Sequence, residues 1–101
     1  MSNKDFRFGI SSSAAGVDLN QLLITHAAST YFMRIANDMP ELGLQTNDII
    51  LVDRALTPKH SDLVVVGIAN DSDLKIMRFQ ELLEEFELWG VVEHVIRKLR
   101  P

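Results

Sequence analysis

Apolar residues in this chain gather in short runs that polar turns separate, a pattern typical of a mainly β domain. Residues 30–35 are β-branched and aromatic, residues 49–52 form a continuous apolar run, and residues 63–68 form another. Apolar runs of this length, with turn residues on both sides, indicate buried strands. The pattern therefore predicts strands over these three ranges.

A hairpin and a final strand complete the predicted sheet. The turn-forming cluster Asn-Asp-Ser-Asp at 70–73 separates two apolar segments, which predicts a hairpin between residues 63–69 and 74–79. Residues 89–96 predict the last strand. Within it, Gly90 indicates a bulge or a close approach of neighbouring backbone, since glycine otherwise weakens a strand.

The N-terminal part predicts an arm and one short helix. Residues 1–16 are polar and rich in small side chains, so we expect a flexible arm. Three leucines between positions 19 and 23 fall on one helical face, and Asp18 precedes them as a cap for a helix that ends near His26. Residues 17–101 then form one β domain of ordinary small size.

Charge and composition exclude several classes of function. The net charge is −4 and the isoelectric point is about 5.2, which argues against direct binding to a nucleic-acid backbone. The one basic cluster, Arg97, Lys98 and Arg100, is interpreted as a solvated chain end. The absence of cysteine excludes disulfides, thiolate metal sites and a thiol nucleophile.

Neither a secretion signal nor a membrane span is expected. Residues 1–8 are charged and lack an apolar core, and no apolar run approaches the length that crosses a bilayer. A cytoplasmic protein without membrane contact is the resulting expectation. The histidines, His26, His60 and His94, have no second ligand at metal spacing, so we expect neither a metal site nor a cofactor.

Four further polar residues are candidates for chemistry. Asp48, Asp53 and Asp62 flank apolar runs and are interpreted as turn formers, because paired catalytic carboxylates are rarer at such positions. Lys75 lies in a predicted strand just after a turn. Facing inward, it would be desolvated and could act as a general base; facing solvent, it would be an ordinary strand lysine, and the pattern alone favours this second interpretation.

Residues 18–26 resemble a segment of the UmuD-type members of the LexA-like serine peptidase family almost residue for residue. Further matches follow in the same order over roughly residues 9–100: they are 29–32, 47–53, 60–65 and 90–96. The resemblance implies a mainly β fold, that of the LexA/UmuD-like C-terminal peptidase domain, with one short N-terminal helix.

Members of that family cleave themselves with a serine–lysine dyad, and the resemblance places Lys75 at the lysine position. The family's Gly-Asp-Ser-Met-like motif is replaced here by Ile-Ala-Asn-Asp-Met-Pro at 35–40, so the nucleophile is lost around Asp38 and Met39. No serine or cysteine occurs from residue 30 to residue 60. The resemblance therefore implies a pseudo-peptidase and not an enzyme.

Two arrangements of the remaining lysine are open. Lys75 either pairs with Asp38 in a partly buried remnant of the site, or it is exposed to water. We favour exposure, because the segment 80–88 is shorter than the family segment that helps to wall the cleft. The family's self-cleavage bond would correspond to the bond between Phe8 and Gly9.

The resemblance implies a non-catalytic accessory subunit in SOS translesion DNA synthesis. Such a subunit, similar to the processed UmuD′ form, would be a homodimer that binds a UmuC-type error-prone polymerase and RecA filaments. The tentative dimer interface comprises Val91, Val92, Val95 and Ile96. The alternative is an inactive regulatory partner that forms heterodimers with an active UmuD or LexA-like peptidase. A third hypothesis is a peptidase with a relocated nucleophile, Ser61 or Ser72.

Overall fold

One long strand, β5 (Phe86–Ile96), joins two halves of an antiparallel sheet. In the computed structural model, which describes residues 16, 18–68, 73–80 and 86–100, the strand order is β1-β2-β5-β3-β4. The other strands are β1 (Thr30–Arg34), β2 (Ile49–Asp53), β3 (Leu63–Ile68) and β4 (Leu74–Arg78). The predicted mainly β fold with one short helix is confirmed.

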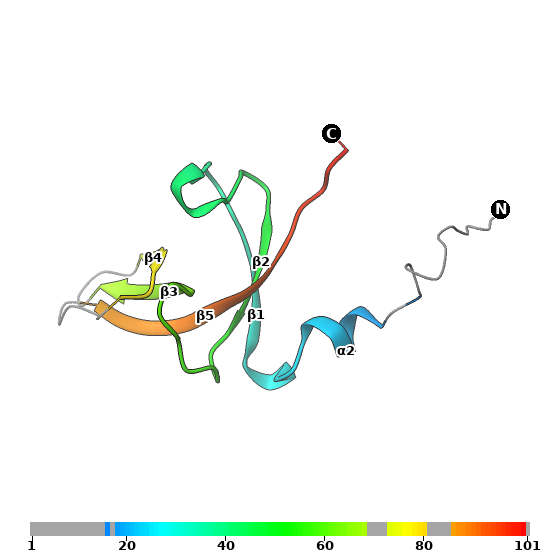
Figure 1. Ribbon diagram of the computed structural model, residues 1–101, viewed down its shortest axis with the longest axis horizontal. Coiled ribbons are helices and arrows are strands. Elements are labelled where there is room, and N and C mark those ends of the chain that lie inside the picture. Colours follow the sequence, from blue (N-terminus) through cyan, green and yellow to red (C-terminus); the bar gives the residue numbers. More distant parts are fainter. Residues whose placement is uncertain (1–15, 17, 69–72, 81–85, 101) are drawn as a thin grey trace.

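Each half of β5 pairs with a different neighbour. Its first half lies beside β3, from Phe86 opposite Ile68 to Val91 opposite Val64, and its second half lies beside β2, up to Ile96 opposite Ile49. Figure 1 shows β5 passing from the β3–β4 pair to the β1–β2 pair. The predicted last strand was too short, since the observed strand begins at Phe86.

The predicted hairpin is confirmed. Strands β3 and β4 pair from Leu63 opposite Arg78 to Gly67 opposite Leu74. Residues 69–72 of its turn lie outside the described residues, as do 81–85 and, in the predicted arm, 1–15 and 17.

Glycine at position 90 allows β5 to pass close to β2. The pairing of β5 with β3 shifts by one residue at Trp89, beside Gly90, and the pairing with β2 shifts at Glu93. A Cβ atom on Gly90 would lie 2.6 Å from Cγ1 of Val52, closer than van der Waals contact permits. Both the bulge and the close approach predicted at this glycine are confirmed.

Strands β2 and β3 are buried on both faces, which explains their continuous apolar runs. One core cluster consists of Ile35, Leu44, Ile50, Val52 and Val65. The other consists of Val64, Val66 and Val91. Since side chains alternate along a strand, successive valines of β3 enter opposite clusters. A strand buried on both faces cannot show the apolar–polar alternation of a half-exposed one.

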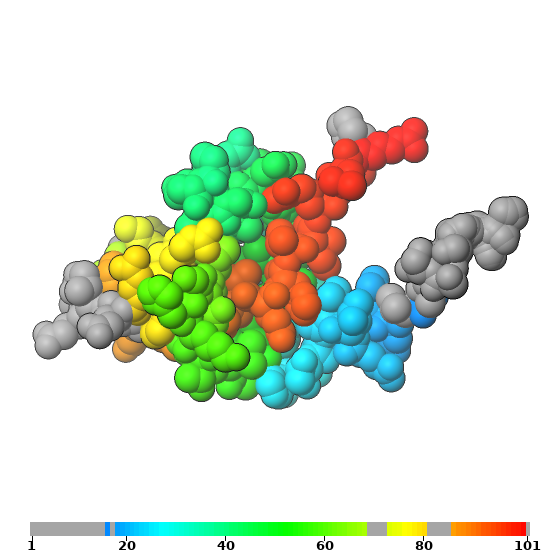
Figure 2. All heavy atoms as spheres, viewed as in Figure 1, coloured from blue at the N-terminus to red at the C-terminus, as the bar shows by residue number. Residues whose placement is uncertain are grey.

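The N-terminal helix is shorter than predicted. Helix α2 (Leu19–Leu23) begins after Asp18, whose Oδ1 accepts a hydrogen bond from the backbone N–H of Asn20 at 3.0 Å, so the predicted cap is confirmed. The helix does not reach His26, because Ile24 is already extended. A 3-10 turn, η1 (Ala27–Ser29), follows. Figure 2 shows α2, in blue, at the margin of the molecule. Across the described ranges, no helix has the length and apolar character needed to cross a membrane.

Replacement of Gly90 by alanine is expected to destabilise the fold. The added methyl group would press on Val52, and such overpacking costs about 1–3 kcal/mol. Gly67→Ala is the matched control, because the nearest atom to its added Cβ, Cδ2 of Leu74, lies at 3.8 Å. Urea denaturation measures both variants. Equal losses of unfolding free energy would contradict the role assigned to Gly90.

Candidate functional site

Hydrogen bonds close the loop between β1 and β2, where the family nucleophile is expected. The Oδ1 atom of Asp38 accepts hydrogen bonds from the backbone N–H of Thr46 at 2.7 Å and from the Thr46 hydroxyl at 2.8 Å. These two bonds, the backbone one first, hold the pKa of Asp38 below its usual value. The carboxylate of Asp38 therefore stabilises the loop, and the hydroxyl of Thr46 acts as a hydrogen-bond donor to it.

A tight turn further stabilises the loop between β1 and β2. Met39 and Leu44 form an isolated antiparallel bridge around the 3-10 turn η2 (Pro40–Leu42). Gly43 ends the turn with φ at 73°, a conformation that costs glycine little. Met39 packs against the first core cluster, so its side chain points into the core.

Arg97, just after β5, is hydrogen-bonded to two residues of the loop between β1 and β2. Its Nε donates to Oδ1 of Asp48 at 2.8 Å, and its Nη2 donates to Oδ2 of Asp48 at 2.6 Å and to the carbonyl of Gly43 at 2.9 Å. The hydrogen bonds from Arg97 lower the pKa of Asp48 to about 2. The interpretation of the basic cluster as a solvated chain end is therefore wrong for Arg97, whereas Lys98 and Arg100 are exposed.

A second buried carboxylate, Asp53, organises the other end of β2. It accepts hydrogen bonds from the hydroxyl of Ser29 at 3.1 Å and the backbone N–H of Ala55 at 2.8 Å, and its Oδ2 lies 2.6 Å from Nδ1 of His26. Burial raises the pKa of Asp53, but these hydrogen bonds outweigh it, and the pKa lies below the usual value. The serine hydroxyl contacts the carboxylate and not the imidazole, so this is no catalytic triad.

The aspartates flanking the apolar runs form turns, as predicted. Besides its bonds to Arg97, Asp48 accepts the backbone N–H of Gln45 at 2.8 Å, and Asp62 accepts that of Lys59 at 2.8 Å. His26 has a structural role through its contact with Asp53. No group of three or more potential metal ligands occurs among the described residues.

The structure does not bring the lysine and the nucleophile position together. Lys75 is exposed on β4 opposite Val66. Its neighbour Ile76 packs against the core cluster that Met39 also contacts. Because side chains alternate along a strand, Lys75 points to the opposite face. Within the described ranges, no ion pair joins Lys75 to Asp38, so the exposed arrangement is the one observed.

Ser61 is not placed to serve as a relocated nucleophile. It lies opposite Phe79, with its backbone N–H 3.3 Å from the carbonyl of that residue. Lys75 lies four residues further along the strand, a distance of about 13 Å. Ser72 is outside the described residues.

The four residues expected at a dimer interface fall into two groups. Val91 is 4% exposed in the second core cluster, and Val92 packs against the first. Val95 and Ile96 are 47% and 43% exposed. Val95 and Ile96 are thus the most exposed of the four, and Val92 is half-buried.

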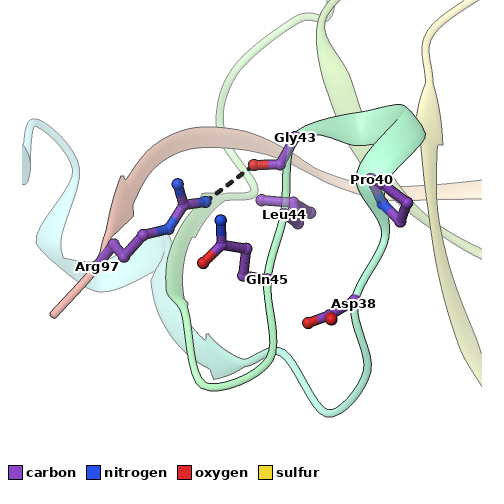
Figure 3. Close-up of a pocket in the computed structure, with 6 residues that line it drawn as sticks. All are labelled: Asp38, Pro40, Gly43, Leu44, Gln45 and Arg97. Atoms are coloured by element: carbon purple, nitrogen blue, oxygen red, sulfur yellow. Dashed lines mark hydrogen bonds between the residues drawn. The ribbon is translucent and has the colours of Figure 1, made fainter. Parts of the chain in front are cut away.

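A hollow of about 480 Å³ lies between the closed loop and Arg97. Figure 3 shows Gln45 between Arg97 and Asp38, with Pro40 on the far side. The lining residues are Asp38, Pro40, Gly43, Leu44, Gln45 and Arg97. We call it the Asp38 hollow.

The Asp48 carboxylate is expected to make folding acid-sensitive. Its pKa is about 2 in the folded protein, below the ordinary value of 3.8 that it regains on unfolding, so its contribution is complete above about pH 4. It is lost as the pH falls towards 2. Urea denaturation midpoints at pH 7, 4 and 2.5 should show this loss of stability, and the loss should be smaller in Asp48→Asn.

Replacement of Arg97 by methionine should lower the urea denaturation midpoint at pH 7, because the hydrogen bonds to Asp48 and Gly43 are removed. Lys98→Met, at the exposed neighbouring residue, should leave the midpoint unchanged, and equal effects of the two substitutions would contradict the role assigned to Arg97.

The exposed position of Lys75 predicts that its removal is tolerated. Lys75→Ala should change the free energy of unfolding by roughly 0.5 kcal/mol or less, as for other surface residues. Chemical denaturation of this variant, Lys75→Met and Asp38→Asn provides the test. A large loss in both lysine variants that disappears when Asp38 is neutralised would instead establish a buried pair.

Known proteins with similar sequences were found, although no protein-family model matches the chain. Protein ImpA of Salmonella typhimurium is 34% identical in an alignment that covers 83% of this chain and 70% of ImpA. Protein MucA of Escherichia coli is 30% identical in an alignment that covers 77% of this chain and 66% of MucA. Protein SamA of Salmonella typhimurium is 29% identical in an alignment that covers 83% of this chain and 71% of SamA. ImpA, MucA and SamA are UmuD-family proteins, and this chain belongs to the UmuD family.

Proposed function

We propose that this chain is a non-catalytic, UmuD′-like accessory subunit in SOS translesion DNA synthesis. Its UmuD-family relatives support a role in SOS mutagenesis. The observation that carries the non-catalytic assignment is the carboxylate of Asp38, hydrogen-bonded to Thr46 at the place where a nucleophile is expected. The proposed partners are a UmuC-type polymerase and RecA filaments, in the cytoplasm.

The chemistry of the loop supports the loss of peptidase activity. A serine–lysine peptidase needs a hydroxyl within hydrogen-bond reach of a neutral lysine. No serine or cysteine occurs between residues 30 and 60. The hydroxyl of Thr46 donates to the carboxylate of Asp38, whose lowered pKa makes it too weak a base to activate a hydroxyl, and Lys75 lies on the opposite face of β4 from Ile76.

The protein is expected to stay intact at alkaline pH. Self-cleaving members of the family become active there because the lysine loses its proton, whereas residues 30–60 of this chain contain no serine or cysteine for Lys75 to activate. Mass spectrometry after incubation at about pH 10 tests this, with and without RecA filaments. A fragment beginning at Gly9 would contradict the proposal.

Asp38→Ser serves as the control for geometry. We expect it to remain intact as well, because Lys75 points away from the loop. Cleavage of this variant alone would leave the wild type inactive but would show that the lysine can reach the nucleophile position.

A homodimer is part of the proposal. The second half of β5 has β2 on one side, and β3 pairs only as far as Val91, so the outer edge beyond that residue has no strand beside it within the described residues. Val95 and Ile96 are exposed along the same segment. A second copy would cover both the apolar side chains and the open edge.

Capture of partners from DNA-damaged cells tests the function. A tagged copy expressed with an untagged copy should retain the untagged copy, a UmuC-type polymerase and RecA. Val95→Lys with Ile96→Lys should reduce retention of the untagged copy, while Leu99→Lys, at a residue that is 91% exposed, should not. Retention of an intact peptidase relative without polymerase would favour the regulatory alternative and overturn the proposal.

A further inference from the structure

The Asp38 hollow contains a carboxylate whose charge no neighbouring cation balances. The guanidinium of Arg97, across the hollow, is matched by the buried carboxylate of Asp48 through two hydrogen bonds. Among the described residues, the hydrogen-bond donors to Asp38 are the neutral groups of Thr46, both of which contact Oδ1. Neither of the ion pairs between described residues includes Asp38. The hollow therefore carries an excess negative charge at neutral pH, where the lowered pKa keeps Asp38 ionised.

The remaining lining of the hollow is suited to a long side chain. Pro40 supplies exposed apolar surface, and Gln45 supplies an exposed side-chain amide that makes no hydrogen bond to another described residue. An aliphatic stem on apolar surface with a charged head on polar groups is the way lysine and arginine are commonly accommodated.

We propose that the Asp38 hollow binds a lysine or arginine side chain of a protein partner. The stem lies against Pro40, and the cation contacts Oδ2 of Asp38 and the amide oxygen of Gln45. An anionic group is disfavoured because Arg97 is already neutralised and Asp38 would repel it. A divalent metal ion is disfavoured because it requires several oxygen ligands, and the hollow offers one carboxylate with a free oxygen. This binding does not depend on the identity of the polymerase or on the loss of cleavage.

Titration of the isotope-labelled full chain with Nα-acetyl-lysine methylamide tests the proposal by NMR. We expect saturable shifts in the backbone amide signals of Gly43 and Gln45, and a similar response to the arginine analogue. The neutral norleucine analogue has the same stem and should bind more weakly by about fivefold, the upper range for an exposed ion pair. Added salt should weaken the lysine analogue and leave the norleucine analogue unchanged.

Asp38→Asn is the decisive variant, because its amide oxygen can still accept from Thr46 while the charge is removed. It should reduce the affinity for the lysine analogue to that of the norleucine analogue. Glu41→Gln is the matched control, since Glu41 is an exposed carboxylate of the same loop that does not line the hollow, and it should bind as the wild type does. Equal affinity in Asp38→Asn and the wild type, stronger binding of an acetyl-aspartate analogue, or no saturable shift with any probe would overturn the proposal.

Discussion

The bidentate contact between Arg97 and Asp48 is the interaction on which the candidate site depends. A carboxylate that is 2% exposed is costly unless its oxygens are occupied, and here both are, by the guanidinium and by the N–H of Gln45. The same guanidinium holds the carbonyl of Gly43, 54 residues earlier in the chain. One side chain at the end of β5 thereby fixes a loop that is distant in sequence.

A similar arrangement secures the opposite end of β2. Asp53 is fully buried, and its hydrogen bonds attach the segment after α2 through His26 and Ser29. Strand β2 is thus bounded by two carboxylates, Asp48 just before it and Asp53 as its last residue. Each carboxylate binds a segment distant in sequence and also stabilises its own local turn. The position of the strand and the paths of the chain around it are set together.

The strands could be predicted from the sequence because buried strand positions are occupied by apolar residues. The apolar runs at β2 and β3, the hairpin and the close approach at Gly90 all follow from local pattern. The partners of Asp48 and Asp53 could not be predicted, since they lie 49 and 27 residues away and no periodicity marks them. The predicted helix was also too long because of a contact distant in sequence: His26 contacts Asp53 instead of continuing the helix. At the candidate site, the lack of serine and cysteine is evident in the sequence, whereas the orientation of Lys75 depends on strand register.

The position of β4 at one margin of the sheet gives Lys75 a use that requires no proton transfer. An outermost strand presents unpaired backbone groups, to which a strand of another molecule can add, and proteins commonly protect such margins with lysine. Lys75 and Arg78 are exposed on this strand, where Leu74 also exposes apolar surface. Bringing two such strands together would place like charges near each other and strip them of water. The charges of Lys75 and Arg78 therefore disfavour the pairing of two β4 strands from separate molecules.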